Sequence, residues 1–355
     1  MSAKRYIRQT TLKEVGNEGQ EKLFDAKILI VGCGGLGNFV AVNLAASGIG
    51  TLHLVDFDRI DISNLHRQVF YKTEDVGKLK AETLCNYIKS INNEINCSFS
   101  NKRLVKNEVR EIIRQFDIVV DCTDGLVTKY LLNDACVLEQ KTLIYGSLYK
   151  FEAHISSFNF QGKESVRTAN LRDVFPEMPT ENLPNCSEVG TLNPIVGIAG
   201  MMQSNEVLKV VLGIGKPLCK ELLVYNALDN SQLKMKLKIN KDLNFNKIWE
   251  TNNYKEEIDC NMKNSNEIEA TEFLERSADK TIKVISVMEE ESEIFDADFH
   301  FPFSSFVAED MELVKDEYVL VCNIGSISRA CVAMLRKQYP DYSFRSLKGG
   351  VFSLV

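Results

Sequence analysis

The sequence predicts an α/β fold in which a doubly wound, mostly parallel sheet is followed by a smaller α/β domain. From residue 27 to about residue 225, short apolar runs alternate with helical stretches, as a parallel sheet requires. After a polar stretch rich in asparagine and charge, the same alternation starts again. We therefore expect a first domain over 1–248, a linker over 249–265 and a second domain over 266–355.

The predicted elements of the first domain follow one another in the order that such a sheet needs. Apolar, strand-like runs occupy 27–32, 51–58, 116–124 and 142–147. Helical patterns separate them at 38–50, 73–92 and 125–140. The remaining expected elements are a strand over 154–160, a weakly structured stretch over 162–184, a long apolar helix over 195–215 and two antiparallel strands over 221–240. The second domain repeats the pattern, with helices at 267–276 and 326–340 and strands at 281–287 and 317–323.

The composition is typical of a globular enzyme. Hydrophobic residues make up 45% of the chain and charged residues 26%. The net charge of −7 disfavours nucleic acid as a partner, because phosphate binding needs a basic surface. The polar start of the chain and the short apolar runs favour a cytoplasmic protein with no membrane-bound part. The ten cysteines include no C-x-x-C pair, so we expect reduced thiols.

A glycine-rich loop between the first strand and helix indicates a nucleotide site of Rossmann type. The loop GCGGLG spans residues 32–37, where glycines let the backbone approach a phosphate at the helix N-terminus. Asp56 ends the next strand, at the place where an acid usually binds a ribose hydroxyl. This pattern alone supports NAD, FAD, S-adenosylmethionine and ATP about equally.

The residues that follow the glycine loop favour MgATP over a redox cofactor. Arg67 and Lys80 supply two cations close to the predicted phosphate site. A hydride-transfer enzyme has little use for both, whereas a triphosphate needs its oxygens neutralised during displacement. Asp124 follows another predicted strand, and a carboxylate there suits Mg²⁺, which usually takes one or two carboxylates along with phosphate oxygens.

Five motifs in order, RYIRQ, GCGGLG, DFDRIDISNLHRQ, GKLKAE and DCTDG, make the chain resemble the MoeB/ThiF (HesA) family, relatives of the ubiquitin-activating enzymes. The resemblance covers about residues 4–240. It implies an adenylyltransferase that uses MgATP to activate the C-terminal Gly-Gly carboxylate of a ubiquitin-like sulfur-carrier protein. Asp124 would be the magnesium ligand. The implied ATP site comprises Gly35, Asp56, Ser63, Asn64, Arg67, Lys80, Asp124 and Gly125.

The resemblance also implies the partners. Arg8, in RYIRQ, matches an arginine that reaches the ATP of a partner subunit, so a homodimer with sites completed in trans is expected. The implied carrier is a MoaD-like small subunit of molybdopterin synthase, which would place the chain in molybdenum cofactor biosynthesis. A ThiS-like carrier in thiazole (thiamine) biosynthesis is the alternative. An NAD-dependent oxidoreductase and a non-catalytic carrier-binding module remain as rival interpretations.

Two further features of the family can be compared with this sequence. Cys186, in LPNCSEVG, stands where relatives carry a cysteine that can form a thioester or acyl-persulfide with the carrier, and a nearby helix N-terminus would lower its thiol pKa. Many relatives hold a structural zinc with two C-x-x-C pairs. Because leucine cannot bind zinc and none of the four thiolates is present, we expect no structural zinc. The residues at those four positions are Asn170, Asp173, Leu243 and Asn246.

The C-terminal domain resembles a rhodanese domain over its whole length. Cys322, Gly325 and Ser328, in CNIGSIS, occupy the loop whose backbone N–H groups stabilise an anionic persulfide in that family. The loop lacks the usual arginine, and the usual D-V-R-E reads SVME at 286–289. The two interpretations are a weak sulfurtransferase, with a cysteine desulfurase or another sulfur donor as partner, and a degenerate docking module.

Overall fold

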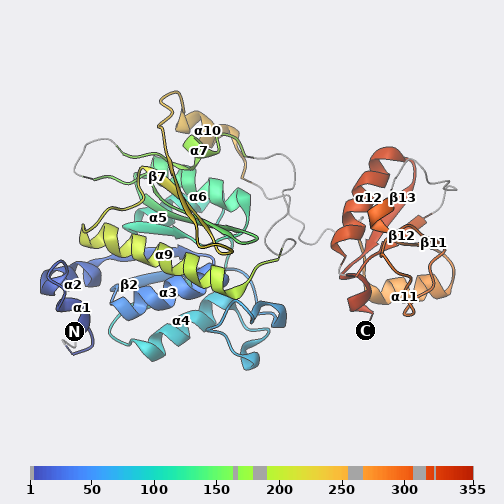
Figure 1. Ribbon diagram of the computed structural model, residues 1–355, viewed down its shortest axis with the longest axis horizontal. Coiled ribbons are helices and arrows are strands. Elements are labelled where there is room, and N and C mark those ends of the chain that lie inside the picture. Colours follow the sequence, from blue (N-terminus) through green and yellow to red (C-terminus); the bar gives the residue numbers. More distant parts are fainter. Residues whose placement is uncertain are drawn as a thin grey trace. The chain divides into compact units, whose positions relative to one another are not determined.

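The computed structural model describes residues 4–162, 167–178, 190–254, 267–306, 317–323 and 325–354. The chain divides into two compact units, Met1–Glu256 and Glu257–Val355 (Figure 1). Each unit carries its own sheet and its own apolar core.

The N-terminal unit is built on a sheet of eight strands. They are β1 (Lys27–Val31), β2 (Thr51–Val55), β3 (Asn96–Ser100), β4 (Ile118–Asp121), β5 (Thr142–Tyr149), β6 (Glu152–Phe158), β7 (Glu221–Asn226) and β8 (Gln232–Lys236). Their order is β3-β2-β1-β4-β5-β6-β7-β8. The first five in that order pair in parallel, whereas β6, β7 and β8 extend the sheet in antiparallel fashion. The expected doubly wound, mostly parallel sheet is confirmed.

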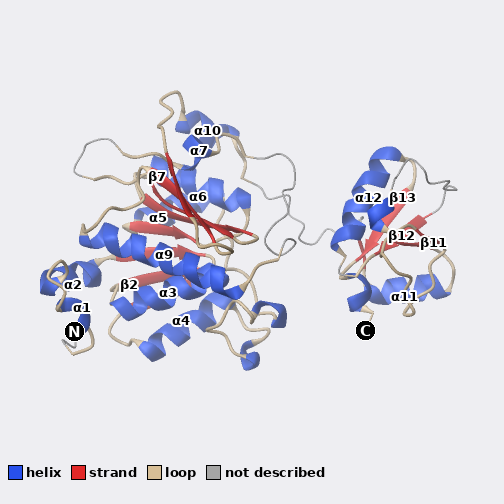
Figure 2. Cartoon of the chain, in the orientation of Figure 1, coloured by secondary structure: helices blue, strands red, loops and turns tan. Residues whose placement is uncertain are grey.

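Helices cover both faces of this sheet, as Figure 2 shows. The helices are α1 (Ile7–Thr10), α2 (Gly16–Asp25), α3 (Gly35–Ser47), α4 (Lys80–Ile91), α5 (Lys106–Arg114), α6 (Leu126–Leu138), α7 (Leu171–Val174), α9 (Asn193–Leu212) and α10 (Phe245–Thr251). One apolar core lies under α3, α4 and α9, and a second lies under α5 and α6. The sheet is therefore buried on both sides over most of its area, which fits the continuous apolar runs of β1 and β4.

Two elements at one edge of the sheet, β3 and α5, were not expected from the sequence. Strand β3 reads NCSFS, and its Ser98 and Ser100 hydroxyl groups hydrogen-bond the two ring nitrogens of His53 at 2.8 and 2.9 Å. These side chains line an open, polar hollow of about 720 Å³. Asn96, Ser98 and Ser100 alternate with the apolar Cys97 and Phe99, so the alternation of a half-buried strand is present but is carried by only two apolar residues.

Helix α4 begins later than the expected helix over 73–92. Thr73–Asp75 forms a short 3₁₀ turn, and Gly77 has a φ of +86° that ends any helical run. Leu79 is extended and bridges to Arg59, so Lys80 becomes the first residue of the helix. Residues 73–79 thus fix the backbone position from which the Lys80 side chain extends.

Helix α9 is the long apolar helix expected over 195–215. Contrary to the expectation from the sequence, it reaches the length and the mean hydropathy, 1.3, of a membrane span. Half of that apolar stretch is buried, against α3, β5 and β6, as in a core helix. A Cβ atom at Gly200 would lie 2.8 Å from Cβ of Phe39 and 3.0 Å from the Leu36 carbonyl oxygen. Glycine therefore lets α3 and α9 approach closely.

The N-terminal unit extends past residue 248, where the sequence suggested that a linker begins. Helix α10 spans Phe245–Thr251 and packs on α6. Beyond it, the Tyr254 hydroxyl donates a 2.6 Å hydrogen bond to the buried carboxylate of Asp134. Residues 249–254 therefore belong to the folded unit because an aromatic side chain anchors them.

The C-terminal unit is a smaller α/β domain, as expected. Its strands are β9 (Glu267–Ile268), β10 (Lys283–Ser286), β11 (Phe299–His300), β12 (Glu317–Val321) and β13 (Ser343–Leu347), and its helices are α11 (Ala270–Ala278) and α12 (Ser326–Gln338). The strands form one parallel sheet in the order β11-β10-β12-β13-β9. Two apolar cores, one on each face of the sheet, hold this unit together.

Candidate nucleotide and thiol sites

The glycine loop lies where β1 ends and α3 begins, at the carboxyl ends of β1 and β4. Gly32 has a φ of +92°, and a Cβ atom there would lie 2.6 Å from the Cys122 carbonyl oxygen. A Cβ atom at Gly37 would overlap the Gly32 carbonyl oxygen. Gly35 is the first residue of α3. The loop therefore needs its glycines, and it presents backbone N–H groups at a helix N-terminus, which suits a phosphate.

Asp56 holds the glycine loop against the end of β2. One carboxylate oxygen accepts a 2.6 Å hydrogen bond from the Cys33 backbone N–H, and the other accepts a 2.8 Å bond from the Asp58 N–H. Burial raises the pKa of Asp56. Each carboxylate oxygen has two lone pairs, so a ribose hydroxyl can still be bound while both backbone contacts are kept.

Lys80 brings an ammonium group to the same place. Its Nζ lies 2.9 Å from Oδ2 of Asp58, and its side chain is 8% exposed. Tyr71 supports the backbone there, because its hydroxyl contacts the carbonyl oxygens of Cys33 at 2.7 Å and of Lys80 at 3.1 Å. One aromatic side chain therefore ties the start of α4 to the glycine loop.

Arg67 follows a short capped turn that contains Ser63 and Asn64. Asp61 caps the 3₁₀ turn Ile62–Asn64 by accepting hydrogen bonds from the Ser63 N–H at 2.8 Å and the Ser63 hydroxyl at 2.6 Å. The Arg67 guanidinium donates to the Ser63 carbonyl oxygen at 3.2 Å. A Cβ atom at Gly35 would lie 3.8 Å from Cγ of Arg67, so this arginine sits beside the first turn of α3.

Asp124 and Gly125 form the turn between β4 and α6. The Asp121 carboxylate accepts hydrogen bonds from the Thr123 N–H at 3.0 Å and the Thr123 hydroxyl at 2.7 Å, which fixes the start of the turn. Asp124 itself is exposed and makes no hydrogen bond or ion pair with any residue in the described part of the chain. Among the described residues no group of three or more metal-binding side chains occurs. A lone carboxylate suits Mg²⁺ that also binds phosphate oxygens.

The predicted nucleotide residues therefore gather at and just after the carboxyl ends of β1, β2 and β4, with one exception. Arg8 lies apart from them in α1, where it is exposed. Cys186, predicted as the thiol that reacts with the carrier, falls outside the described residues. The residues that gather are Gly35, Asp56, Ser63, Asn64, Arg67, Lys80, Asp124 and Gly125.

Sequence reasoning missed a buried polar group beneath the Asp124 turn. Lys129 of α6 is 3% exposed, and its Nζ lies 3.1 Å from the Asp121 carboxylate and 2.8 Å from the Gly146 carbonyl oxygen. The Gln203 amide of α9 donates to the Asp121 carbonyl oxygen at 2.7 Å. The sequence did contain a signal for this group: Lys129 interrupts the apolar pattern of 126–138 and follows Asp121, which ends a strand, by eight residues.

Two of the four positions of the missing zinc ligands, Asn170 and Asp173, are joined to each other by hydrogen bonds. Asp173 accepts hydrogen bonds from the Asn170 backbone N–H at 2.8 Å and the Asn170 side-chain amide at 2.6 Å. Its other carboxylate oxygen accepts a 2.7 Å bond from the Asn240 backbone N–H. The Asp173 carboxylate thus ties residues 170–173 to Asn240, which follows β8 and lies three residues before Leu243.

In the C-terminal unit, the loop after β12 surrounds the thiol of Cys322. The Gly325 and Ser328 backbone N–H groups point at its sulfur at 3.1 and 3.3 Å, and the Ser328 hydroxyl lies 3.3 Å from it. Gly325, with a φ of +84°, caps α12. Convergent backbone dipoles at the start of a helix stabilise negative charge on sulfur.

Comparison with known proteins agrees with this geometry. The family model described as the ThiF family matches residues 6–245. The chain is 40% identical over 237 residues to a sulfur carrier protein adenylyltransferase of Thermus thermophilus, covering 66% of this chain and 88% of that protein. It is 38% identical over 253 residues to MoeZ of Mycobacterium tuberculosis, named a probable adenylyltransferase/sulfurtransferase, covering 71% of this chain and 64% of that protein.

Solved structures show the same fold. The structure of Escherichia coli MccB with ATP aligns with a TM-score of 0.59 at 24% sequence identity and covers 68% of this chain and 74% of that one. The family match takes in every residue that gathers at the glycine loop. The chain therefore belongs to the ThiF family, in the group whose members are named adenylyltransferases.

Proposed function

We propose that this chain uses MgATP to adenylate the C-terminal Gly-Gly carboxylate of a ubiquitin-like sulfur-carrier protein. The observation that carries the proposal is the convergence of Lys80, Arg67 and Asp124 on the glycine loop. Two cations and a free carboxylate around a phosphate-binding helix suit a magnesium-bound triphosphate, whereas hydride transfer would use none of the three. The name of the Thermus relative supports a sulfur-carrier protein as substrate, and that of the Mycobacterium relative supports adenylyl transfer.

The proposed reaction is an in-line displacement at the α-phosphorus. A carrier carboxylate oxygen forms a bond to this phosphorus, the bond to the bridging β-phosphate oxygen breaks, and pyrophosphate leaves. Arg67 and Lys80 would neutralise charge on the phosphate oxygens, and the helix N-terminus at Gly35 would hold a phosphate. Asp124 would bind Mg²⁺, which supplies further charge neutralisation. The chain mainly positions the two reactants and offsets the developing charge.

The carrier would approach over the antiparallel end of the sheet. Tyr149 and Phe151 lie at the tip of the β5–β6 hairpin, and Leu228 lies in the turn between β7 and β8; they are 50%, 37% and 70% exposed. Because β5 runs parallel to β4, both tips lie at the end of the sheet that carries Asp124. Exposed apolar side chains beside a site suit a protein substrate.

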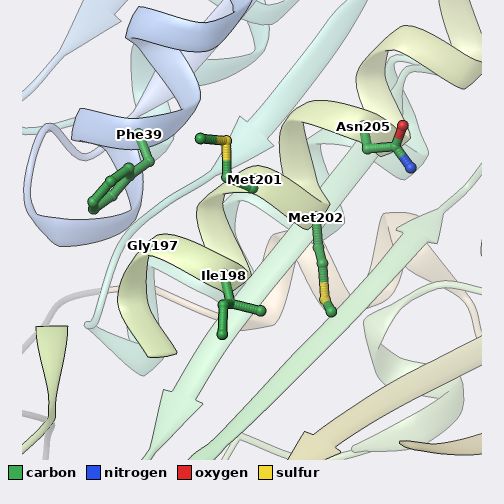
Figure 3. Close-up of a pocket in the computed structure, with 6 residues that line it drawn as sticks. All are labelled: Phe39, Gly197, Ile198, Met201, Met202 and Asn205. Atoms are coloured by element: carbon green, nitrogen blue, oxygen red, sulfur yellow. The ribbon is translucent and has the colours of Figure 1, made fainter. Parts of the chain in front are cut away.

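We also propose that the chain acts as a homodimer in which Arg8 reaches the partner's site. A shallow hollow of about 490 Å³ opens between α3 and α9 and is lined mainly by apolar side chains (Figure 3). Met201 at its rim is 47% exposed. The lining residues are Phe39, Gly197, Ile198, Met201, Met202 and Asn205. An exposed apolar face on an otherwise well packed helix pair is typical of a subunit contact.

An ATP–pyrophosphate exchange assay tests the adenylation proposal. The full chain is incubated with MgATP, labelled pyrophosphate and either a MoaD-like or a ThiS-like carrier that ends in Gly-Gly. We expect exchange with the MoaD-like carrier and none with the same carrier lacking its last glycine. Faster exchange with the ThiS-like carrier would assign the chain to thiazole biosynthesis. No exchange with either carrier, together with binding of NAD, would overturn the proposal in favour of an oxidoreductase.

For the C-terminal unit we propose transfer of sulfur through Cys322, accepted from a cysteine desulfurase or another donor. The two backbone N–H groups aimed at its sulfur favour this over a docking role, because they stabilise an anionic persulfide. Cyanide-labile sulfur on Cys322, lost in Cys322→Ala, is the expected result. Full thiocarboxylate formation by Cys322→Ala with a sulfur donor present would leave only the docking role.

A further inference from the structure

A closed group of buried polar contacts lies directly beneath the turn that carries Asp124. Lys129 Nζ links the Asp121 carboxylate of β4 to the Gly146 carbonyl oxygen of β5, at 3.1 and 2.8 Å. The second oxygen of that carboxylate is used by the N–H and the hydroxyl of Thr123, the residue before Asp124. One ammonium group is thus connected to the proposed magnesium ligand through one carboxylate.

The same group reaches α9. The Gln203 amide donates to the Asp121 carbonyl oxygen, and a Cβ atom at Gly146 would overlap the Gln203 side chain. Asp121 and Gln203 are fully buried, so water cannot replace a lost partner. Burial lowers the pKa of Lys129, but the attraction and hydrogen bond of Asp121, together with Tyr145 and Cys122, raise the pKa overall, so the ammonium stays charged. The turn is therefore held from below by a buried ion pair between β4 and α6, whose two members are also hydrogen-bonded to β5 and α9.

We propose that Lys129 is a positioning residue that, through Asp121 and Thr123, holds Asp124 in the orientation that magnesium and the triphosphate require. This inference rests on the proposed MgATP site. A buried ion pair is a costly way to stabilise a fold, since apolar residues of similar volume often serve as well. A buried ion pair does, however, fix the position of the Asp121 carboxylate, and through it that of the proposed metal ligand Asp124. Loss of a group that orients a metal ligand typically weakens metal affinity.

The test compares ATP binding to the full chain with and without Mg²⁺, measured by titration calorimetry. The variant Lys129→Met/Asp121→Asn removes both charges of the pair and keeps the volumes, so no lone charge is buried. We expect the gain in ATP affinity that Mg²⁺ gives to the unaltered chain to fall by about tenfold in the double variant. ATP affinity in EDTA should change little, because Arg67, Lys80 and the glycine loop are left intact. The variant Lys129→Arg should recover most of the magnesium effect.

A matched control neutralises another buried pair of the same helix. Arg172 and Asp134 are in contact at 2.7 Å, and both side chains are buried, but the pair ties α6 to α7 rather than to the Asp124 turn. Arg172→Met/Asp134→Asn should lower the unfolding temperature to a similar extent and leave the magnesium effect intact. An equal loss of the magnesium effect in this control would show a general effect of destabilisation and would overturn the proposal.

Three further outcomes are decisive. A folded Lys129→Met/Asp121→Asn variant with an unaltered magnesium effect would overturn the role of Lys129. Should that variant fail to fold, Thr123→Val removes only the 2.7 Å hydroxyl contact to Asp121, and an unaltered magnesium effect there would overturn it equally. If the unaltered chain binds ATP no better with Mg²⁺ and gives no pyrophosphate exchange, the proposed function itself fails, independently of every variant.

Discussion

The Nζ atom of Lys80 lies 2.9 Å from Oδ2 of Asp58, and the two side chains meet the solvent very differently: Lys80 is 8% exposed, whereas Asp58 is 48% exposed. The Lys80 ammonium is therefore held in place because the aliphatic part of its side chain is buried, whereas the Asp58 carboxylate approaches it from the solvent. A phosphate oxygen can take the place of this carboxylate without moving Lys80. The cation is pre-organised, which reduces the ordering that substrate binding would otherwise require.

Lys80→Met should abolish most of the adenylation activity. Methionine preserves the buried stem but removes the charge, and loss of one preorganised group of this kind costs about 10²–10³-fold in rate. Pyrophosphate exchange measures the loss, and circular dichroism checks the fold. Lys78→Met is the matched control, because Lys78 is exposed and pairs with Asp75 away from the glycine loop. Equal exchange in Lys80→Met and Lys78→Met would contradict a role in phosphate binding.

Mixing two inactive variants should restore activity if Arg8 completes the partner's site. Arg8→Ala and Lys80→Met lie on different elements, and in a mixed dimer one of the two sites carries neither change. Random exchange of subunits would make about half of the dimers mixed, so exchange activity should return to about a quarter of the unaltered level. Recovery is measured after co-refolding or co-expression. Activity that stays at the level of the single variants would show that Arg8 acts within its own subunit.

The sequence indicated the glycine loop and the acid after β2 better than it indicated the buried groups that support them. Glycines at 32–37 and the acid at 56 are dictated by local backbone geometry and by strand ends, so their roles can be read from spacing. The contacts of Lys129 cannot be read in this way, because Asp121, Gly146 and Gln203 come together only in the folded sheet. Local patterns find motifs, whereas the groups that support them are set by tertiary packing.

Strand β3 and the start of α4 were misjudged for a related reason. The polar face of β3 lines an open hollow instead of a core, so only Cys97 and Phe99 mark the buried face of this short strand. The late start of α4 follows from the positive φ of Gly77 and the bridge between Arg59 and Leu79. The bridge between Arg59 and Leu79 joins residues twenty positions apart, so the helical periodicity of 73–92 does not reveal it.

Gly350→Ala should disturb the loop around Cys322. Gly350 has a φ of +63°, and a Cβ atom there would overlap the Cys322 carbonyl oxygen. Backbone strain together with this overlap should cost about 1–3 kcal/mol of the stability of the C-terminal unit. Gly349→Ala is the matched control, since its φ is +75° but its Cβ would meet only the Ser353 side chain, at 3.1 Å. Urea unfolding of the full chain, followed in the C-terminal unit by hydrogen exchange, should rank Gly350→Ala well below Gly349→Ala, and the reverse order would refute the argument.

The stability of the chain should fall as the pH rises from about 10 to about 12, and Tyr130 should account for part of the fall. The Tyr130 hydroxyl, 3.0 and 2.8 Å from the carbonyl oxygens of Phe175 and Glu177, belongs to a buried side chain. Burial raises the pKa of Tyr130 to about 12, above its ordinary value near 10. A raised pKa means that the folded state keeps the proton when the unfolded chain has lost it. The stabilisation is therefore complete below about pH 10 and is lost as the pH climbs through the folded pKa.

Tyr130→Phe tests this because phenylalanine cannot ionise in either state. At pH 8 the free energy of unfolding of Tyr130→Phe should be lower, because the two hydrogen bonds are missing. Between pH 10 and 12 it should fall less steeply with pH, because up to one proton fewer is released on unfolding. Urea unfolding at several pH values measures the slope. Tyr149→Phe is the control, because Tyr149 is half exposed in the folded chain and its surroundings change far less on unfolding. If Tyr130→Phe retained the full slope, the alkaline loss of stability would have to come from other groups, such as the thiol of Cys331, whose pKa burial also raises to about 12.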